Sequence, residues 1–140
     1  MAKKQPVKSI FPLVTKIEEA GIPVQFEELP QGLCGAYDSE GYIVLSTVLS
    51  TQMQLNTLVH EFSHALSISV EQYDLCDFEE EVLAFAVEQM IFQKLPAHIA
   101  IKSVQKKIEK QYACFPPAIP QVDTEFLEQH VCKVKELLDL

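Results

Sequence analysis

The sequence predicts an α+β fold in which one helix and a small three-stranded sheet precede a run of helices. Three patterns support this: a helical apolar stripe near the N-terminus, short alternating segments separated by turn residues, and long helical stripes thereafter. With 140 residues, 48% of them hydrophobic and 22% charged, the chain fits one globular domain over residues 1–140. Residues 1–8 are expected to be flexible.

The first third of the chain should supply the N-terminal helix and the sheet. The helix is predicted with Pro12 in its first turn and Gly21 as its stop signal, and its stripe comprises Val7, Ile10, Phe11, Val14 and Ile17. Residues 22–26 alternate between apolar and polar and predict a strand. Residues 33–37 and 42–46 flank a turn-rich tetrapeptide, which indicates a hairpin.

Four helices are predicted after the sheet. The first opens at Thr51, which forms a pattern like a capping box with Gln54, and runs to about Val70. The polar, acidic residues 67–80 suggest a loop, and a very apolar helix follows over residues 79–95. A further helical stripe covers residues 97–108. The proline-rich residues 115–121 then form a linker to a last helix capped by Asp123.

Composition and charge exclude several classes of function. The net charge is −9 with no basic stripe, so direct binding to nucleic acid is not expected. The longest apolar run, residues 82–87, is far too short to span a membrane, and no signal-peptide pattern is present, so we expect a cytoplasmic protein. The four cysteines form no CxxC pair and are expected to be free thiols. The oligomeric state cannot be derived from these patterns.

An HExxH motif at residues 60–64, with the sequence HEFSH, carries the clearest chemical signal. Histidines at i and i+4 lie one turn apart on one helix face, so His60 and His64 can bind a single ion. Glu61 is offset by about 100° around the helix, so it can act on water without binding the metal. The apolar residues of this helix cluster on another face. Two exposed histidines on an ordinary amphipathic helix are the alternative interpretation.

A zinc site of this kind needs a third protein ligand and keeps one position for water. The acidic start of the next predicted helix offers Glu79, Glu80 and Glu81. Carboxylates are also common in the first turn of a helix because they interact well with its dipole, so at most one of the three is needed as a ligand. Two imidazoles and a carboxylate suit Zn²⁺, although they do not by themselves exclude manganese or iron.

These segments resemble the ImmA/IrrE family of metallopeptidases. The resemblance covers residues 32–95, and the matching blocks are residues 41–46 (GYIVLS), 57–64 (TLVHEFSH) and 79–86 (EEEVLAFA). It implies a zincin-like fold, His60, His64 and Glu81 as metal ligands, and Glu61 as the general base. It also implies limited proteolysis of a protein such as a helix-turn-helix repressor. The chain departs from the family pattern at Ser63, where glycine is usual, at Val82, where alanine is usual, and in lacking a Met-Pro pair after the helix.

The leading functional hypothesis is therefore a zinc-dependent endopeptidase with a protein substrate. The main alternative is a metal-stabilised binding or regulatory protein that has lost proteolysis, although a purely structural site would not need Glu61. A chance HExxH motif in a protein without enzymatic function is a third possibility.

Other residues near the motif have open roles at this point. Glu88 is either a partner of a ligand histidine or a carboxylate facing solvent. The strand at residues 42–46 could offer an exposed edge to an extended substrate. Several side chains could stabilise an oxyanion by chemistry alone, and these are Tyr73, His98, Tyr112 and His130.

Overall fold

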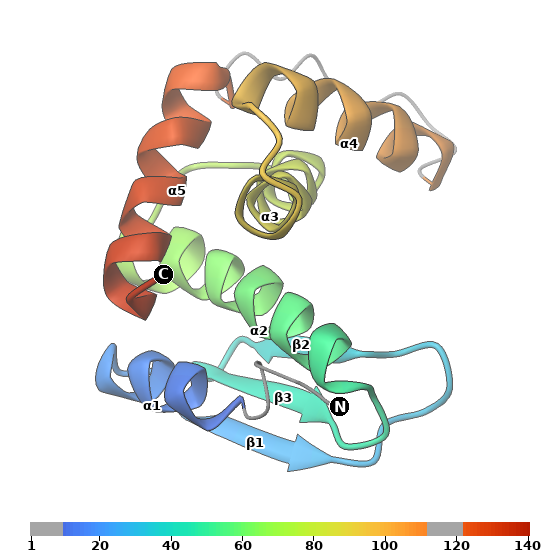
Figure 1. Ribbon diagram of the computed structural model, residues 1–140, viewed down its shortest axis with the longest axis vertical. Coiled ribbons are helices and arrows are strands. Elements are labelled where there is room, and N and C mark those ends of the chain that lie inside the picture. The colour runs from blue at the N-terminus through green and yellow to red at the C-terminus, as the bar shows by residue number, and fades with distance from the viewer. Residues whose placement is uncertain (1–9, 112–121) are drawn as a thin grey trace, which may run out of the picture.

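Helices stacked above a small sheet make up the computed structural model, which describes residues 10–111 and 122–140 (Figure 1). In chain order the elements are α1 (Phe11–Glu19), β1 (Val24–Glu27), β2 (Gly35–Asp38), β3 (Tyr42–Ser46), α2 (Thr51–Ala65), the π-helical segment η1 (Leu66–Val70), α3 (Asp77–Phe92), α4 (Ala97–Gln111) and α5 (Thr124–Leu138). The predicted α+β class is confirmed. The expected flexible residues 1–8 and linker 115–121 lie outside the described residues.

The sheet is mixed, with strand order β1-β3-β2. Strand β3 pairs in parallel with β1 and antiparallel with β2, so it is the central strand. The prediction that residues 42–46 offer an exposed edge is therefore wrong, because both edges of that strand are already hydrogen-bonded. The hairpin was predicted, but β1 joins it on the side of β3, which leaves β2 as the edge strand beside α2.

Helix α2 begins at Thr51, as predicted, but its cap differs from the expected one. Ser50 is the N-cap residue, and its hydroxyl accepts a hydrogen bond from the backbone N–H of Met53 at 3.3 Å. The Gln54 side chain instead donates to the carbonyl of Ser46. Ser50 and Thr51 both have side chains suited to capping, and the extended backbone of Ser50 decides between them.

The chain between the second and third helices has a shorter loop than predicted. The helical path continues through the π-helical segment to Val70, and α3 begins at Asp77, two residues before Glu79. The side chain of Glu79 turns back and accepts a hydrogen bond from the backbone N–H of Cys76 at 2.9 Å, which stabilises this early start. The expected loop of residues 67–80 is thus reduced to residues 71–76, and α3 ends at Phe92 rather than at residue 95.

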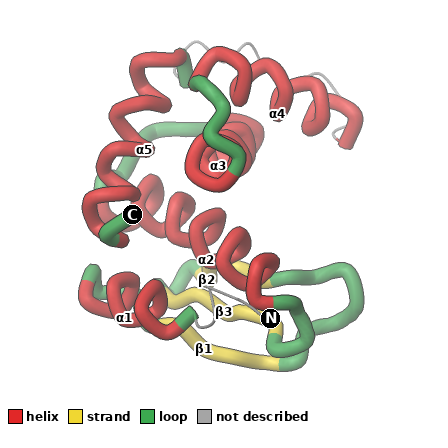
Figure 2. Tube along the Cα trace, viewed as in Figure 1, coloured by secondary structure: helices red, strands yellow, loops and turns green. Residues whose placement is uncertain are grey.

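Helix α3 is apolar almost all round because other helices surround it. It contacts α2, α4 and α5, and Val82, Leu83 and Val87 are fully buried. Helix α2 in turn lies between the sheet and α3 (Figures 1 and 2). This layering holds α2 and α3 side by side, and both carry the residues of the motif. None of the helices in the described ranges is long and apolar enough to cross a membrane.

The last helix, α5, begins as predicted with Asp123 as its N-cap, which accepts a hydrogen bond from the backbone N–H of Phe126 at 2.8 Å. It stands across the ends of the other helices and contacts each of α1 to α4 (Figure 1). Its buried face includes Leu127, Val131 and Val134. We infer that α5 helps to hold the two motif-bearing helices in register.

Candidate metal centre

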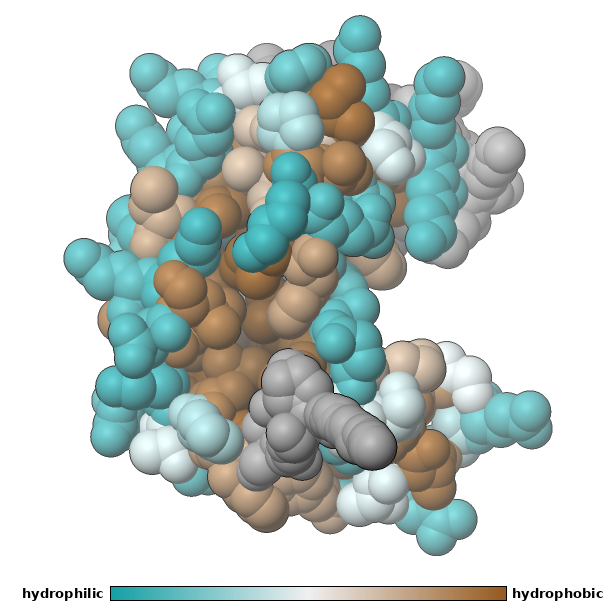
Figure 3. Space-filling view, in the orientation of Figure 1, coloured by the Kyte–Doolittle hydropathy of each residue, from teal (hydrophilic) through white to brown (hydrophobic). Residues whose placement is uncertain are grey.

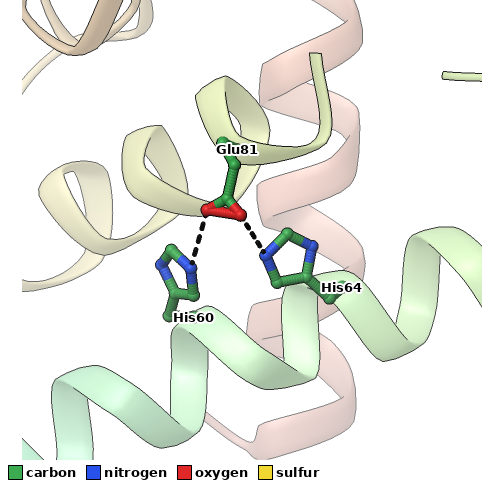
Figure 4. Close-up of side chains that lie close together, drawn as sticks. All are labelled: His60, His64 and Glu81. Carbon is green, nitrogen blue, oxygen red and sulfur yellow. Dashed lines mark ion pairs between the residues drawn. The ribbon is translucent and has the colours of Figure 1, made fainter. Parts of the chain in front are cut away.

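His60 and His64 project from consecutive turns of α2 toward α3 (Figure 4). Each is only 9% exposed, although both lie off the apolar stripe of the helix. Their ring centroids are 5.0 Å apart, and the ring of Phe85 on α3 packs edge-on against His60 at 4.4 Å. Helix α3 thus covers both histidines. This excludes the alternative interpretation, in which they are two exposed side chains on an ordinary amphipathic helix.

Glu81 on α3 completes a triangle of possible ligands. Its Oε1 lies 3.4 Å from Nε2 of His60, and its Oε2 lies 3.3 Å from Nε2 of His64. One ligand atom from each residue can be chosen so that all three lie within 4.8 Å of one another. Figure 4 shows the carboxylate pointing at both rings. This cluster could hold a metal ion, and two imidazole nitrogens with one carboxylate are a donor set that zinc accepts.

Two more carboxylates bind the far side of the histidine rings. Nδ1 of His60 lies 2.6 Å from Oε2 of Glu88, and Nδ1 of His64 lies 3.1 Å from Oε1 of Glu80. Glu88, whose role the sequence left open, is thus a partner of a candidate ligand histidine. An N–H at each Nδ1 donates to its carboxylate, which leaves Nε2 free to bind a metal.

Glu80 also contacts His64, although its Cβ leaves α3 about 100° around the helix from that of Glu81. It is 8% exposed, and its Oε2 accepts a hydrogen bond from the hydroxyl of Ser67 on η1. The helical angle describes only the direction in which Cβ leaves the helix. His64 offers ring nitrogens on two edges, so Glu80 and Glu81 can contact the same ring from different sides. Glu79, in contrast, belongs to the cap of α3.

The pKa values of the cluster reflect this pairing. Burial alone would lower the pKa of His60, but hydrogen bonds to Glu81 and Glu88 raise it to about 9. For His64, the same opposition between burial and its bonds to Glu80 and Glu81 raises the pKa to about 10. Burial would raise the pKa of Glu81, whereas the two histidines hold it at about 2. A metal ion must therefore displace protons from both histidines, so its affinity should rise with pH.

Glu61 lies beside this triangle rather than in it. It is 9% exposed and lines two adjoining cavities, one on each side of the cluster. The larger, of about 540 Å³, is also lined by Asp77, Glu80 and Glu81, and we name it the acidic pocket. Burial raises the pKa of Glu61 above its ordinary value, which brings it closer to the range useful for a general base.

The edge strand β2 forms another wall of both cavities, which the sequence did not indicate. Gly35 lines both of them. A Cβ atom on Gly35 would lie 2.7 Å from the carbonyl oxygen of Val44 and 2.8 Å from Cγ2 of Thr57 on α2. Glycine therefore allows the edge strand to lie close to the helix that carries the histidines. Tyr37 of the same strand hydrogen-bonds to Ser69 of η1.

His130, an oxyanion candidate from the sequence, has a different position. It is 1% exposed on α5, and its Nε2 lies 2.9 Å from the hydroxyl of Ser63 while its Nδ1 lies 3.3 Å from the hydroxyl of Tyr73. Tyr73 is thereby occupied as well. His98 is exposed on α4 and lines neither cavity, and Tyr112 lies outside the described residues. The contact between His130 and Ser63 ties α5 to the motif-bearing helix.

We predict that His130 makes the protein sensitive to acid. Burial, followed by the charge of Lys133, lowers its pKa to about 4, so it is neutral in the folded protein. The unfolded chain binds its proton near pH 6.5. The stability that neutral His130 contributes is therefore complete above about pH 6.5. As the pH falls toward 4, the free energy of unfolding decreases by up to about 3 kcal/mol. Urea unfolding of metal-free protein between pH 7 and 4.5 measures it as the difference from a variant without His130, because His60 and His64 also bind protons in the unfolded chain in this range.

His130→Phe is the matched variant for this measurement. It removes the titrating group while it keeps a ring at the buried position, so its unfolding free energy should depend less steeply on pH. Equal slopes in wild type and variant would mean that His130 does not titrate in this window.

Comparisons with protein-family models, with curated proteins and with solved structures find no match for this chain. The geometry of the cluster and its cavities is therefore the basis for assigning a function.

Proposed function

We propose that this protein is a zinc-dependent endopeptidase that cleaves a peptide bond of a partner protein. The observation that carries the proposal is the placement of Glu61 beside a ready-formed triangle of His60, His64 and Glu81, with open cavities on both sides. A structural zinc site usually has four protein ligands and is closed. This cluster has three, and it opens onto space large enough for a ligand.

The arrangement of elements supports a zincin-like fold. A sheet strand lies beside the helix with the two histidines, and the third ligand comes from the next helix, as the resemblance to the ImmA/IrrE family implies. We further propose that the chain belongs to that family and acts in the cytoplasm. Its substrate would be a protein such as a helix-turn-helix repressor.

Zinc, when bound, would polarise the scissile carbonyl and lower the pKa of water toward about 7. Glu61 would take the proton of the attacking water and deliver it to the leaving amine. Glu80 and Glu88 would keep the histidine rings in the orientation and tautomer that present Nε2 to the metal.

The edge strand β2 is suited to hold the substrate. Its residues Gly35, Ala36 and Tyr37 line the acidic pocket, and one of its edges is not paired within the described sheet. An extended peptide could add to this edge through backbone hydrogen bonds, which align a peptide regardless of its sequence. This replaces the expected role of residues 42–46.

Metal analysis tests the proposal. Protein purified without chelators should carry about one zinc per chain, and His60→Ala or His64→Ala should lose most of it because each removes one of three ligands. Leu140→Ala, an exposed change far along the chain, serves as the control. Absence of any bound transition metal would exclude the peptidase. Bound zinc with tight binding of a candidate substrate, but no cleavage, would favour the regulatory protein instead.

A further inference from the structure

The second cavity beside Glu61 differs in chemistry from the acidic pocket. It has a volume of about 340 Å³ and lies at the N-terminal end of α2, where it is lined by Cys34, Met53, Thr57 and Phe85 together with His60 and Glu61. We name it the apolar pocket. Figure 3 shows the outline of the molecule notched between the part with the sheet and the part with the upper helices.

The two carboxylates and the Asn56 amide oxygen of the apolar pocket already have partners or a proposed role. Glu88 is bound to Nδ1 of His60, and the Asn56 amide oxygen accepts a hydrogen bond from Gln52 at 2.8 Å. Glu61 is the proposed general base. A charged side chain entering this cavity would lose water without gaining an uncommitted counter-charge, which is costly. An apolar side chain would instead contact Met53 and the ring of Phe85.

The two cavities adjoin across the reactive centre. Gly35, His60 and Glu61 line both of them, so a peptide lying across the cluster would place neighbouring residues in different cavities. The acidic pocket carries the exposed Asp77 in addition to Glu80 and Glu81. At about 340 Å³, the apolar pocket is near the lower end of ligand sites, which run from about 300 to 1,000 Å³. One side chain rather than a longer peptide segment fits it.

We propose that the apolar pocket binds an apolar side chain of the peptide substrate, such as leucine or phenylalanine, next to the scissile bond. This inference rests on the proposed peptidase function and adds the substrate class. Met53 is the specificity-determining residue at its rim. The residue is 48% exposed on the first turn of α2, so its side chain can be changed without opening the core.

The experiment has two steps and uses the zinc-loaded full chain. A library of unstructured decapeptides with randomised centres is digested, and mass spectrometry gives the residues that flank each cut. Zinc-loaded Glu61→Gln is the blank for contaminating proteases. Leucine-type or aromatic residues should be preferred over alanine by about tenfold or more at one position beside the cut, and aspartate should be rejected there.

The second step compares variants on two peptides that differ only by leucine or lysine at that position. Met53→Glu should lower the ratio of kcat/KM for leucine over lysine by about tenfold or more, because it places a carboxylate at the pocket rim. A carboxylate in the first turn also suits the helix dipole, so the fold should tolerate it. Val48→Glu is the matched control, since Val48 is 67% exposed and lines neither cavity.

The outcomes separate the two proposals. Cleavage without an apolar preference beside the cut, or a preference that Met53→Glu leaves unchanged, would overturn the apolar pocket and leave the peptidase intact. Absence of zinc-dependent cleavage of any peptide would overturn the peptidase and the inference that rests on it.

Discussion

Replacing Glu81 by glutamine should weaken zinc binding by roughly a hundredfold to a thousandfold. Structural zinc sites bind with about 10–16 kcal/mol, so one ligand of three or four accounts for several kcal/mol. Both oxygens of Glu81 face the Nε2 atoms of His60 and His64, and no other carboxylate does so in the described cluster. Competition with a coloured chelator measures the affinity.

The neighbouring carboxylates give a graded comparison. Glu80→Gln and Glu88→Gln should each weaken zinc binding by about tenfold to a hundredfold, the usual effect of losing a partner that orients a ligand histidine. Glu79→Gln is the control on the same helix turn, because Glu79 caps α3 through the backbone N–H of Cys76 and glutamine can accept the same hydrogen bond. A large loss with Glu88→Gln and none with Glu81→Gln would make Glu88 the third ligand.

Glu61→Gln should abolish most proteolysis while zinc stays bound. General acid–base catalysis contributes about 10²–10⁴-fold to rate, and an amide cannot take the proton of water. Glu61 is outside the ligand triangle, so zinc affinity should change little. The measurement pairs kcat on a cleaved peptide with the zinc content of the same preparation.

Glu40→Gln provides the matched control, since Glu40 is an exposed carboxylate in the turn between β2 and β3. It should retain full activity and zinc. Undiminished cleavage by Glu61→Gln would place the general base on another residue. Loss of zinc together with activity would mean that Glu61 supports the metal rather than the proton transfer.

Local patterns in the sequence were sufficient for the presence and order of the helices and for the paired histidines, but not for the bounds of α3. The i and i+4 spacing of His60 and His64 is a property of one helix, so it predicts their common face without knowledge of the fold. Asp123 as a cap and Gly21 as a stop signal are local in the same way, and Gly21 indeed has a positive φ of 96°. Glu81 was selected among three glutamates because residues 79–86 resemble the ImmA/IrrE pattern. The structure places Glu81 against the rings of His60 and His64.

Only the tertiary structure decided which strand is the edge and which residues complete the centre. Strand order depends on how β1 approaches the hairpin, and Glu80, Glu88 and His130 reach their partners across 16, 28 and 67 residues of chain. Helical periodicity gives the direction in which a side chain leaves its own helix. It cannot give the distance to another helix, because that distance is set by the packing of α2, α3 and α5 around a shared core.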